Sequence, residues 1–187
     1  MTAGRTRRVY FALWPDSAQQ AELVEATKAT VVESRGRALP AGSLHVTLAF
    51  LGAVPESRLV DVRAIGARIA AAASSQSRLF FTRSECWKRA GALCAVAEQT
   101  DPVAAAIADG LKRELVAAGF APDLKPFRPH VTLARKIRIV RGREHTRDDG
   151  LALRPILWTF SAFALVDSRT EAEGAIYTVL DSFRIGR

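Results

Sequence analysis

Two copies of the sequence His-Val-Thr-Leu are the residues of this chain best suited to chemistry. They begin at His45 and His130, and an alanine follows each copy. With this composition, the shared Val-Thr-Leu-Ala would follow two histidines by chance with a probability on the order of one in ten thousand. A single His-x-Thr is common and usually belongs to packing, so the duplication is what indicates function.

Strand geometry predicts which of these side chains act together. Side chains alternate between the two faces of a β-strand, so His45 shares a face with Thr47, and His130 shares a face with Thr132. If helices cover the faces that carry the valines and leucines, the two polar faces can meet across one ligand. That ligand would contact two imidazoles and two hydroxyls.

Two imidazoles suit the hydrolysis or transesterification of a phosphodiester without a metal. A neutral imidazole takes a proton from the attacking oxygen, and an imidazolium gives one to the leaving oxygen. Threonine hydroxyls can donate hydrogen bonds to the phosphate oxygens, and the guanidinium of Arg135, which follows the second copy, can offset the developing charge. The residues alone leave open which histidine gives the proton.

Other catalytic signatures are absent from the sequence, including a GxxxxGK[ST] phosphate loop, a GxSxG nucleophile elbow and an HExxH metal site. Cys86 and Cys94 form no CxxC motif and no Cys/His cluster, so we expect reduced core thiols. The remaining histidine, His145, lies in a polar stretch and is expected in a solvated loop. We therefore expect neither a metal nor a cofactor.

The composition predicts one globular domain spanning residues 1–187, with 49% hydrophobic and 25% charged residues. The apolar run at residues 9–14 is too short for a signal-peptide core, and no membrane span follows it. We expect a cytoplasmic monomer. The formal net charge of +8 favours a polyanionic partner such as nucleic acid, although a genomic bias toward arginine would give the same charge.

Hydrophobic periodicity and turn residues predict an α+β chain. Helices are expected over residues 15–34, 55–73 and 101–118, and strands over residues 9–13, 44–50, 79–87, 93–97, from 130 onward, 156–166 and 175–180. Residues 167–174 are expected to form a polar turn. The aromatic residues Trp14, Trp87, Phe127 and Trp158 are expected to pack in the core or between lobes.

With His-hydrophobic-Thr-hydrophobic present twice, the sequence resembles the 2H phosphoesterase superfamily and, within it, the LigT-like RNA 2′,3′-cyclic phosphodiesterases. The segments RRVYFALWP, SLHVTLAFLGAV, FRPHVTLAR and SRTEAEGAIYTVL carry the resemblance, with Ser168, Gly174 and Tyr177 at the family's spacing. It implies a bilobal α+β fold in which two pseudo-twofold-related, largely antiparallel sheets are backed by helices around an active-site cleft. Residues 136–149 depart from the family because they lack a clear amphipathic helix.

The resemblance also implies a role for each residue of the site. His45 would be the proton donor and His130 the proton acceptor, while Thr47, Thr132 and Arg135 would hold the phosphate. The reaction would open a terminal 2′,3′-cyclic phosphate of RNA to a 2′-phosphate, and its reversal, with a ribose hydroxyl as nucleophile, would be 2′-5′ RNA ligation. RNA ends or nucleotide 2′,3′-cyclic phosphates would be the partners.

Two alternatives to this function remain open. A phosphodiesterase with the same mechanism could act on 2′-5′-linked oligonucleotides or on small cyclic nucleotide phosphates, because the motif contacts a phosphodiester and not a whole RNA. The arginine-rich stretch 135–143 raises the other alternative, an RNA-binding module without turnover. A panel of substrates, together with salt-dependent RNA binding in the absence of product, separates the three.

Overall fold

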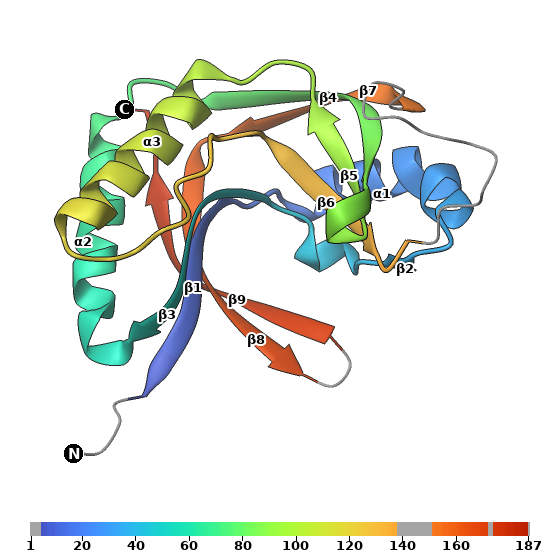
Figure 1. Cartoon of the computed structure of the whole chain (residues 1–187). Coiled ribbons are helices and arrows are strands. Elements are labelled where there is room, and N and C mark those ends of the chain that lie inside the picture. The colour runs from blue at the N-terminus through green and yellow to red at the C-terminus, as the bar shows by residue number, and fades with distance from the viewer. Residues whose placement is uncertain (1–4, 138–150, 172–173, 187) are drawn as a thin grey trace.

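The computed structural model describes residues 5–137, 151–171 and 174–186, which form an α+β fold (Figure 1). The strands are β1 (Thr6–Leu13), β2 (Arg37–Ala38), β3 (Val46–Pro55), β4 (Ser77–Trp87), β5 (Ala92–Ala97), β6 (His130–Arg135), β7 (Leu151–Phe160), β8 (Ala162–Glu171) and β9 (Gly174–Arg184). The helices are α1 (Ser17–Glu33), α2 (Leu59–Ala72) and α3 (Pro102–Ala117), with short 3-10 turns η1 (Ala41–Ser43), η2 (Glu56–Arg58) and η3 (Lys88–Ala90). The predicted fold class is confirmed.

The strands within the described ranges join into one curled antiparallel sheet. Its order is β7-β4-β5-β6-β3-β1-β8-β9, with β2 beside β6. The strands that carry the repeated motif, β3 and β6, are neighbours at the centre, and three strands flank them on each side. The two expected sheets are therefore the halves of a single sheet, and they correspond strand for strand about the β3–β6 pair.

Helices α1 and α3 begin where the sequence predicts, because the residue before each one caps free backbone N–H groups. The start expected at residue 55 is wrong: β3 continues to Pro55, η2 follows, and α2 begins at Leu59 without a side-chain cap. The Asp16 carboxylate accepts from the N–H of Gln19, whose side chain accepts from the N–H of Asp16. Asp101 accepts from the N–H of Ala104 in the same way, and Pro102 begins α3. In the described part of the chain, no helix is long and apolar enough to cross a membrane.

Helix α2 packs closely on the sheet through a glycine. Its buried residues Leu59, Val62 and Ile65 form the apolar face that the sequence predicts. A Cβ at Gly66 would lie 2.7 Å from the ring of Phe183 and 3.0 Å from the ring of Phe11. Glycine usually weakens a helix interior, but here it lets the helix backbone approach these rings.

The two faces of the sheet differ in what covers them. Val9, Phe11 and Leu13 of β1 are buried in the main core, together with residues of all three helices. Tyr10 and Ala12 point to the opposite face, where they form a separate small cluster. We call this second face the open face. Figure 1 shows α2 and α3 against one half of the sheet and α1 beside the other.

Most predicted packing residues lie where the sequence places them. Trp158 is fully buried, and Phe127 packs against the main core. Cys94 is buried and Cys86 is half-buried, both as free thiols. Residues 138–150 lie outside the described ranges, and with them His145 and most of the arginine-rich stretch.

The prediction for the C-terminal strands is wrong in two respects. The single run expected at residues 156–166 is two strands, β7 and β8, which separate at Ser161. The polar turn expected from Asp167 is strand instead, since β8 and β9 stay paired as far as Glu171 opposite Gly174. The polar side chains predicted a turn because a sequence pattern reads burial from hydrophobicity. Asp167 is instead buried, at 2% exposure, because its charge is paired with that of Arg7.

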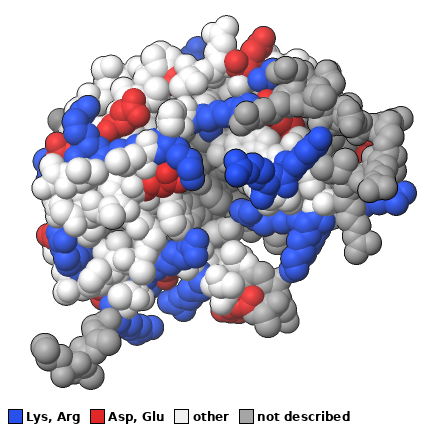
Figure 2. All heavy atoms as spheres, viewed as in Figure 1, with Lys and Arg blue, Asp and Glu red and all other residues white. Residues whose placement is uncertain are grey.

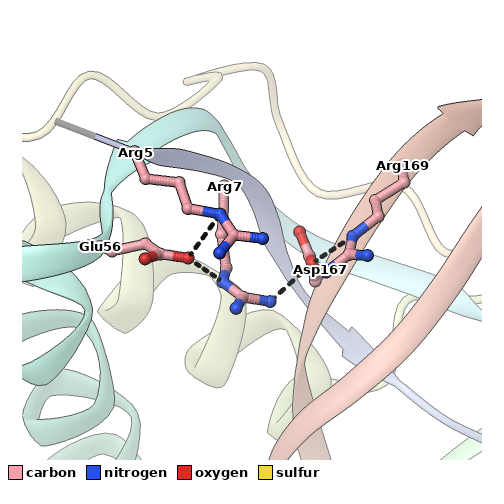
Figure 3. Close-up of polar contacts among 5 residues, drawn as sticks. All are labelled: Arg5, Arg7, Glu56, Asp167 and Arg169. Atoms are coloured by element: carbon pink, nitrogen blue, oxygen red, sulfur yellow. Dashed lines mark hydrogen bonds and ion pairs between the residues drawn. The ribbon is translucent and has the colours of Figure 1, made fainter. Parts of the chain in front are cut away.

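An ion-pair cluster holds this end of the sheet together (Figure 3). The Arg7 guanidinium of β1 donates to Glu56 at 2.8 Å and to Asp167 of β8 at 3.0 Å. Arg169 donates to Asp167 at 3.3 Å, and Arg5 lies 3.5 Å from Glu56. These contacts satisfy the buried carboxylate and close this end of the core between β1 and β8.

Asp167→Asn should lower the free energy of unfolding by about 1–3 kcal/mol, because two charge-assisted hydrogen bonds lose their acceptor charge. Chemical denaturation measures this difference. Asp181→Asn is the matched control, since the Arg63–Asp181 pair is more exposed than Asp167, with side chains 44% and 31% exposed, and should contribute less than about 1 kcal/mol. Equal losses in the two variants would contradict a stabilising role for the buried pair.

Candidate active site

The backbone pairing of Val46 with Val131 brings the two motif copies together. These residues are antiparallel partners between β3 and β6, and both side chains are 0% exposed on the core face. Residues next to such a pair point to the opposite face, so His45 lies across from Thr132, and Thr47 lies across from His130. The four polar side chains predicted from the sequence therefore share the open face at the centre of the sheet.

Each copy of the motif contains a β-bulge at its leucine. On β3, Thr47 and Ala49 pair with consecutive residues of β1, so Leu48 is the extra residue. On β6, Thr132 and Ala134 pair with consecutive residues of β5, and Leu133 is extra. The repeat thus extends beyond sequence to an identical backbone irregularity in both halves.

The bulge decides where Arg135 points. Regular alternation would place Arg135 and His130 on opposite faces, because their positions differ by five, an odd number. The extra residue reverses the alternation and returns position 135 to the open face, as it returns Phe50 in the first copy. Arg135 accordingly acts electrostatically on both histidines.

Hydrogen bonds fix the tautomer of both imidazoles. Nδ1 of His45 lies 2.7 Å from the carbonyl oxygen of Ser43, and Nδ1 of His130 lies 2.8 Å from that of Arg128. A carbonyl can only accept, so each Nδ1 carries the proton and donates. When the rings are neutral, each Nε2 therefore keeps its lone pair for a ligand.

Aromatic rings surround His45. Trp14 stacks parallel to the imidazole with centroids 5.3 Å apart, Tyr10 lies at 5.0 Å, and Tyr177 approaches edge-on at 5.3 Å. Burial lowers the pKa of His45 to about 4; the positive charges of His130 and Arg135 also lower it, while the hydrogen bond to Ser43 opposes the change. His45 is thus neutral near pH 7 in the free protein.

His130 has a more polar environment. Its ring lies 4.3 Å from that of Trp87, and Val96 is its partner on β5. Burial lowers its pKa, and Arg128 and Arg135 lower it further, while the Arg128 carbonyl and the negative charge of Glu85 raise it. The two halves thus give their histidines different electrostatic surroundings.

The two threonines are half-buried beside the histidines. The Cys94 thiol donates a weak hydrogen bond to the Thr132 hydroxyl oxygen across 4.0 Å, and burial raises the pKa of this thiol to about 12. Because Cys94 remains protonated, it donates and the Thr132 hydroxyl keeps its own hydrogen for a ligand. A phosphate oxygen could accept that hydrogen.

Sequence reasoning placed Trp14 and Trp87 among the packing aromatics, but each lies against a histidine of the site. The signal for Trp14 was present, since Tyr10, Ala12 and Trp14 alternate with the core residues of β1 and continue its open face. Trp87 carried no such signal, because β4 does not pair with β6. Glu85, which contacts Trp87, was missed for the same reason.

The surroundings of the site favour an anion. On the face shown in Figure 2, Lys and Arg side chains border the recess between the two halves of the molecule. Within the described ranges, no three His, Cys, Asp or Glu side chains gather as a metal site would require. Two Nε2 atoms, two hydroxyls and one guanidinium therefore form the polar set that a phosphate could contact.

Comparison with known proteins gives consistent matches. The family model described as the 2′-5′ RNA ligase superfamily matches residues 14–172. A Thermus thermophilus protein named RNA 2′,3′-cyclic phosphodiesterase is 33% identical over 189 aligned residues, which cover 95% of this chain and 90% of that protein.

Solved structures show the same fold. The T. thermophilus protein TT0787 is 31% identical with a TM-score of 0.73, covering 96% of this chain and 99% of its own. E. coli LigT complexed with 3′-AMP is 20% identical with a TM-score of 0.80, covering 98% of this chain and 100% of its own. The LigT-like arrangement predicted from the sequence is thereby confirmed.

Imidazole ¹⁵N chemical shifts should report both histidines as Nδ1–H tautomers. In a pH titration of the ligand-free protein, both should titrate below the ordinary value of 6.5, with His45 near 4. Burial is the main reason, because it penalises the charged ring. An Nε2–H tautomer, or a His45 that titrates at or above 6.5, would contradict the geometry described here.

Proposed function

The chain belongs to the 2′-5′ RNA ligase superfamily, and on this premise we propose that it hydrolyses terminal 2′,3′-cyclic phosphates of RNA to 2′-phosphates. The observation that carries the proposal is the pairing of β3 with β6, which directs two Nε2 atoms toward one face. The name of the T. thermophilus relative supports the substrate class. The reaction proceeds by paired-histidine acid-base catalysis.

Each proton in the reaction has a donor and an acceptor. Nε2 of His130 takes a proton from water as the water oxygen attacks phosphorus, and the bond from phosphorus to O3′ breaks. Protonated His45 gives the proton on its Nε2 to O3′, which leaves the phosphate on O2′. Proton exchange with solvent then resets both rings. A ribose hydroxyl in place of water would give 2′-5′ ligation.

The remaining residues of the motif act on the phosphate oxygens. Thr47 and Thr132 donate hydroxyl hydrogen bonds, and Arg135 offsets the negative charge that grows in the transition state. The bound phosphate also raises the pKa of His45, because an anion favours the imidazolium that proton donation requires. Substrate binding thus prepares the donor, which is neutral in the free protein.

His45→Gln and His130→Gln should each lower turnover of a 2′,3′-cyclic-phosphate RNA by about 10²–10⁴-fold, because glutamine transfers no proton. The assay separates the substrate from the 2′-phosphate product, and EDTA should leave the wild-type rate unchanged. His145→Gln, which changes the only histidine outside the motif, is the matched control. Full activity in both motif variants, with folding retained, would refute the proposal.

The pH profile of kcat/KM should be a bell with its maximum below pH 6.5. The rate falls at low pH as the acceptor becomes protonated and at high pH as the donor loses its proton. Both limbs lie on the acidic side because burial lowers both pKa values, His45 to about 4. The maximum of the profile lies at the same pH whichever histidine is the donor. A maximum above pH 7 would be inconsistent with these buried rings.

A further inference from the structure

Glu85 is a buried carboxylate beside the site to which the proposed reaction gives no role. It lies on β4, and its side chain is 4% exposed. One Arg128 nitrogen lies 2.7 Å from both carboxylate oxygens, the Trp87 indole N–H donates to Oε2 at 2.9 Å, and Arg83 lies 3.2 Å from Oε1. Several donors from two segments thus converge on one carboxylate.

Two of these donors also contact His130. The Arg128 main-chain carbonyl accepts the hydrogen bond from Nδ1 of His130, and the Trp87 ring packs 4.3 Å from the imidazole. The Arg128 guanidinium lies 5.3 Å from the centre of the Trp87 ring. Glu85 therefore closes a ring of contacts that begins and ends at His130, without contacting the imidazole itself.

The first half of the molecule holds its histidine differently. The carbonyl that orients His45 belongs to Ser43 in η1, where the N–H of Ser43 donates to Pro40 and that of Leu44 donates to Ala41. Residues 121–129, before β6, contain neither helix nor strand, and Pro129 after Arg128 has no N–H. The Pro129 carbonyl accepts from the N–H of Ala97, and the side-chain contacts with Glu85 hold Arg128 in addition.

We propose that Glu85 is a positioning residue for His130: its carboxylate anchors Arg128 and Trp87, and these hold the imidazole so that Nε2 points to the ligand. The proposal rests on the proposed function, because it assigns a supporting role to a residue near one of the two acid-base groups. A displacement of the reacting groups by about 1 Å can cost 10²-fold in rate, so the support of the imidazole bears directly on turnover.

Glu85 also offsets positive charge around His130. Arg128 and Arg135 lower the pKa of His130, and Glu85 raises it. The charge of His130 acts on His45, the Cys94 thiol also responds to Glu85 and Arg128, and Arg83 pairs with Glu85 from the same strand. Removal of the Glu85 charge leaves the two arginines less compensated, so the pKa of His130 should fall further.

Glu85→Gln tests the proposal, with Glu56→Gln as the matched control. Both variants neutralise an arginine-paired carboxylate, but Glu56 lies in the ion-pair cluster of Arg7, away from the histidines. Glu85→Gln should lower kcat by about 10–100-fold with little change in KM, and should lower the pKa of His130 in an NMR titration. Glu56→Gln should lower the free energy of unfolding but leave kcat and the pKa of His130 unchanged. Wild-type kcat and His130 titration in Glu85→Gln would overturn the proposal.

Glu85→Asp provides a second test if the glutamine variant does not fold. Aspartate keeps the charge but is one methylene shorter, so it cannot reach Arg128 and Trp87 together; kcat should fall although the pKa of His130 changes little. A wild-type kcat in Glu85→Asp would show that Glu85 does not control the position of the His130 imidazole. The titration of ligand-free Glu85→Gln needs no substrate, so it tests the electrostatic action of Glu85 on His130 even if the wild type proves inactive on cyclic phosphates.

Discussion

The pairing of Val46 with Val131 is the constraint on which the site depends. Each valine is buried in the core, so its neighbours must point to the open face. Because the strands are antiparallel, the histidine of one copy lies opposite the threonine of the other. A slip of one residue in either strand would turn its His and Thr toward the core, and burial of the valines prevents that slip.

The two halves have the same backbone arrangement around the motif but carry different side chains beside their histidines. Position 50 in the first copy is a phenylalanine packed beside Tyr10, whereas position 135 in the second is an arginine opposite the small Ala92. The first half therefore offers an aromatic wall around His45, and the second offers positive charge beside His130. One phosphate between them would meet different surroundings on its two sides, which is what an acid and a base require.

Much of the site could be predicted from the sequence because strand alternation and capping are local. The His-Thr pairs and the helix starts at Asp16 and Asp101 depend only on neighbouring residues. The bulge at Leu133 could not be predicted, because Leu-Ala pairs as easily with regular strand, and simple alternation would have turned Arg135 away from His130. Contacts such as Asp167 with Arg7 and Glu85 with Arg128 join segments that are far apart in the sequence. The length of β8 and the contacts that support His130 could therefore be found only from the structure.

A crystal structure of the protein with an RNA 2′-phosphate bound would test the central claim most directly. The phosphate should lie within hydrogen-bonding distance, about 3.2 Å or less, of Nε2 of both His45 and His130. Arg135 should lie beside the phosphate on the side of His130. That result would show that the paired strands hold both histidines to one phosphate. A phosphate bound to one histidine alone, or elsewhere on the molecule, would contradict the account.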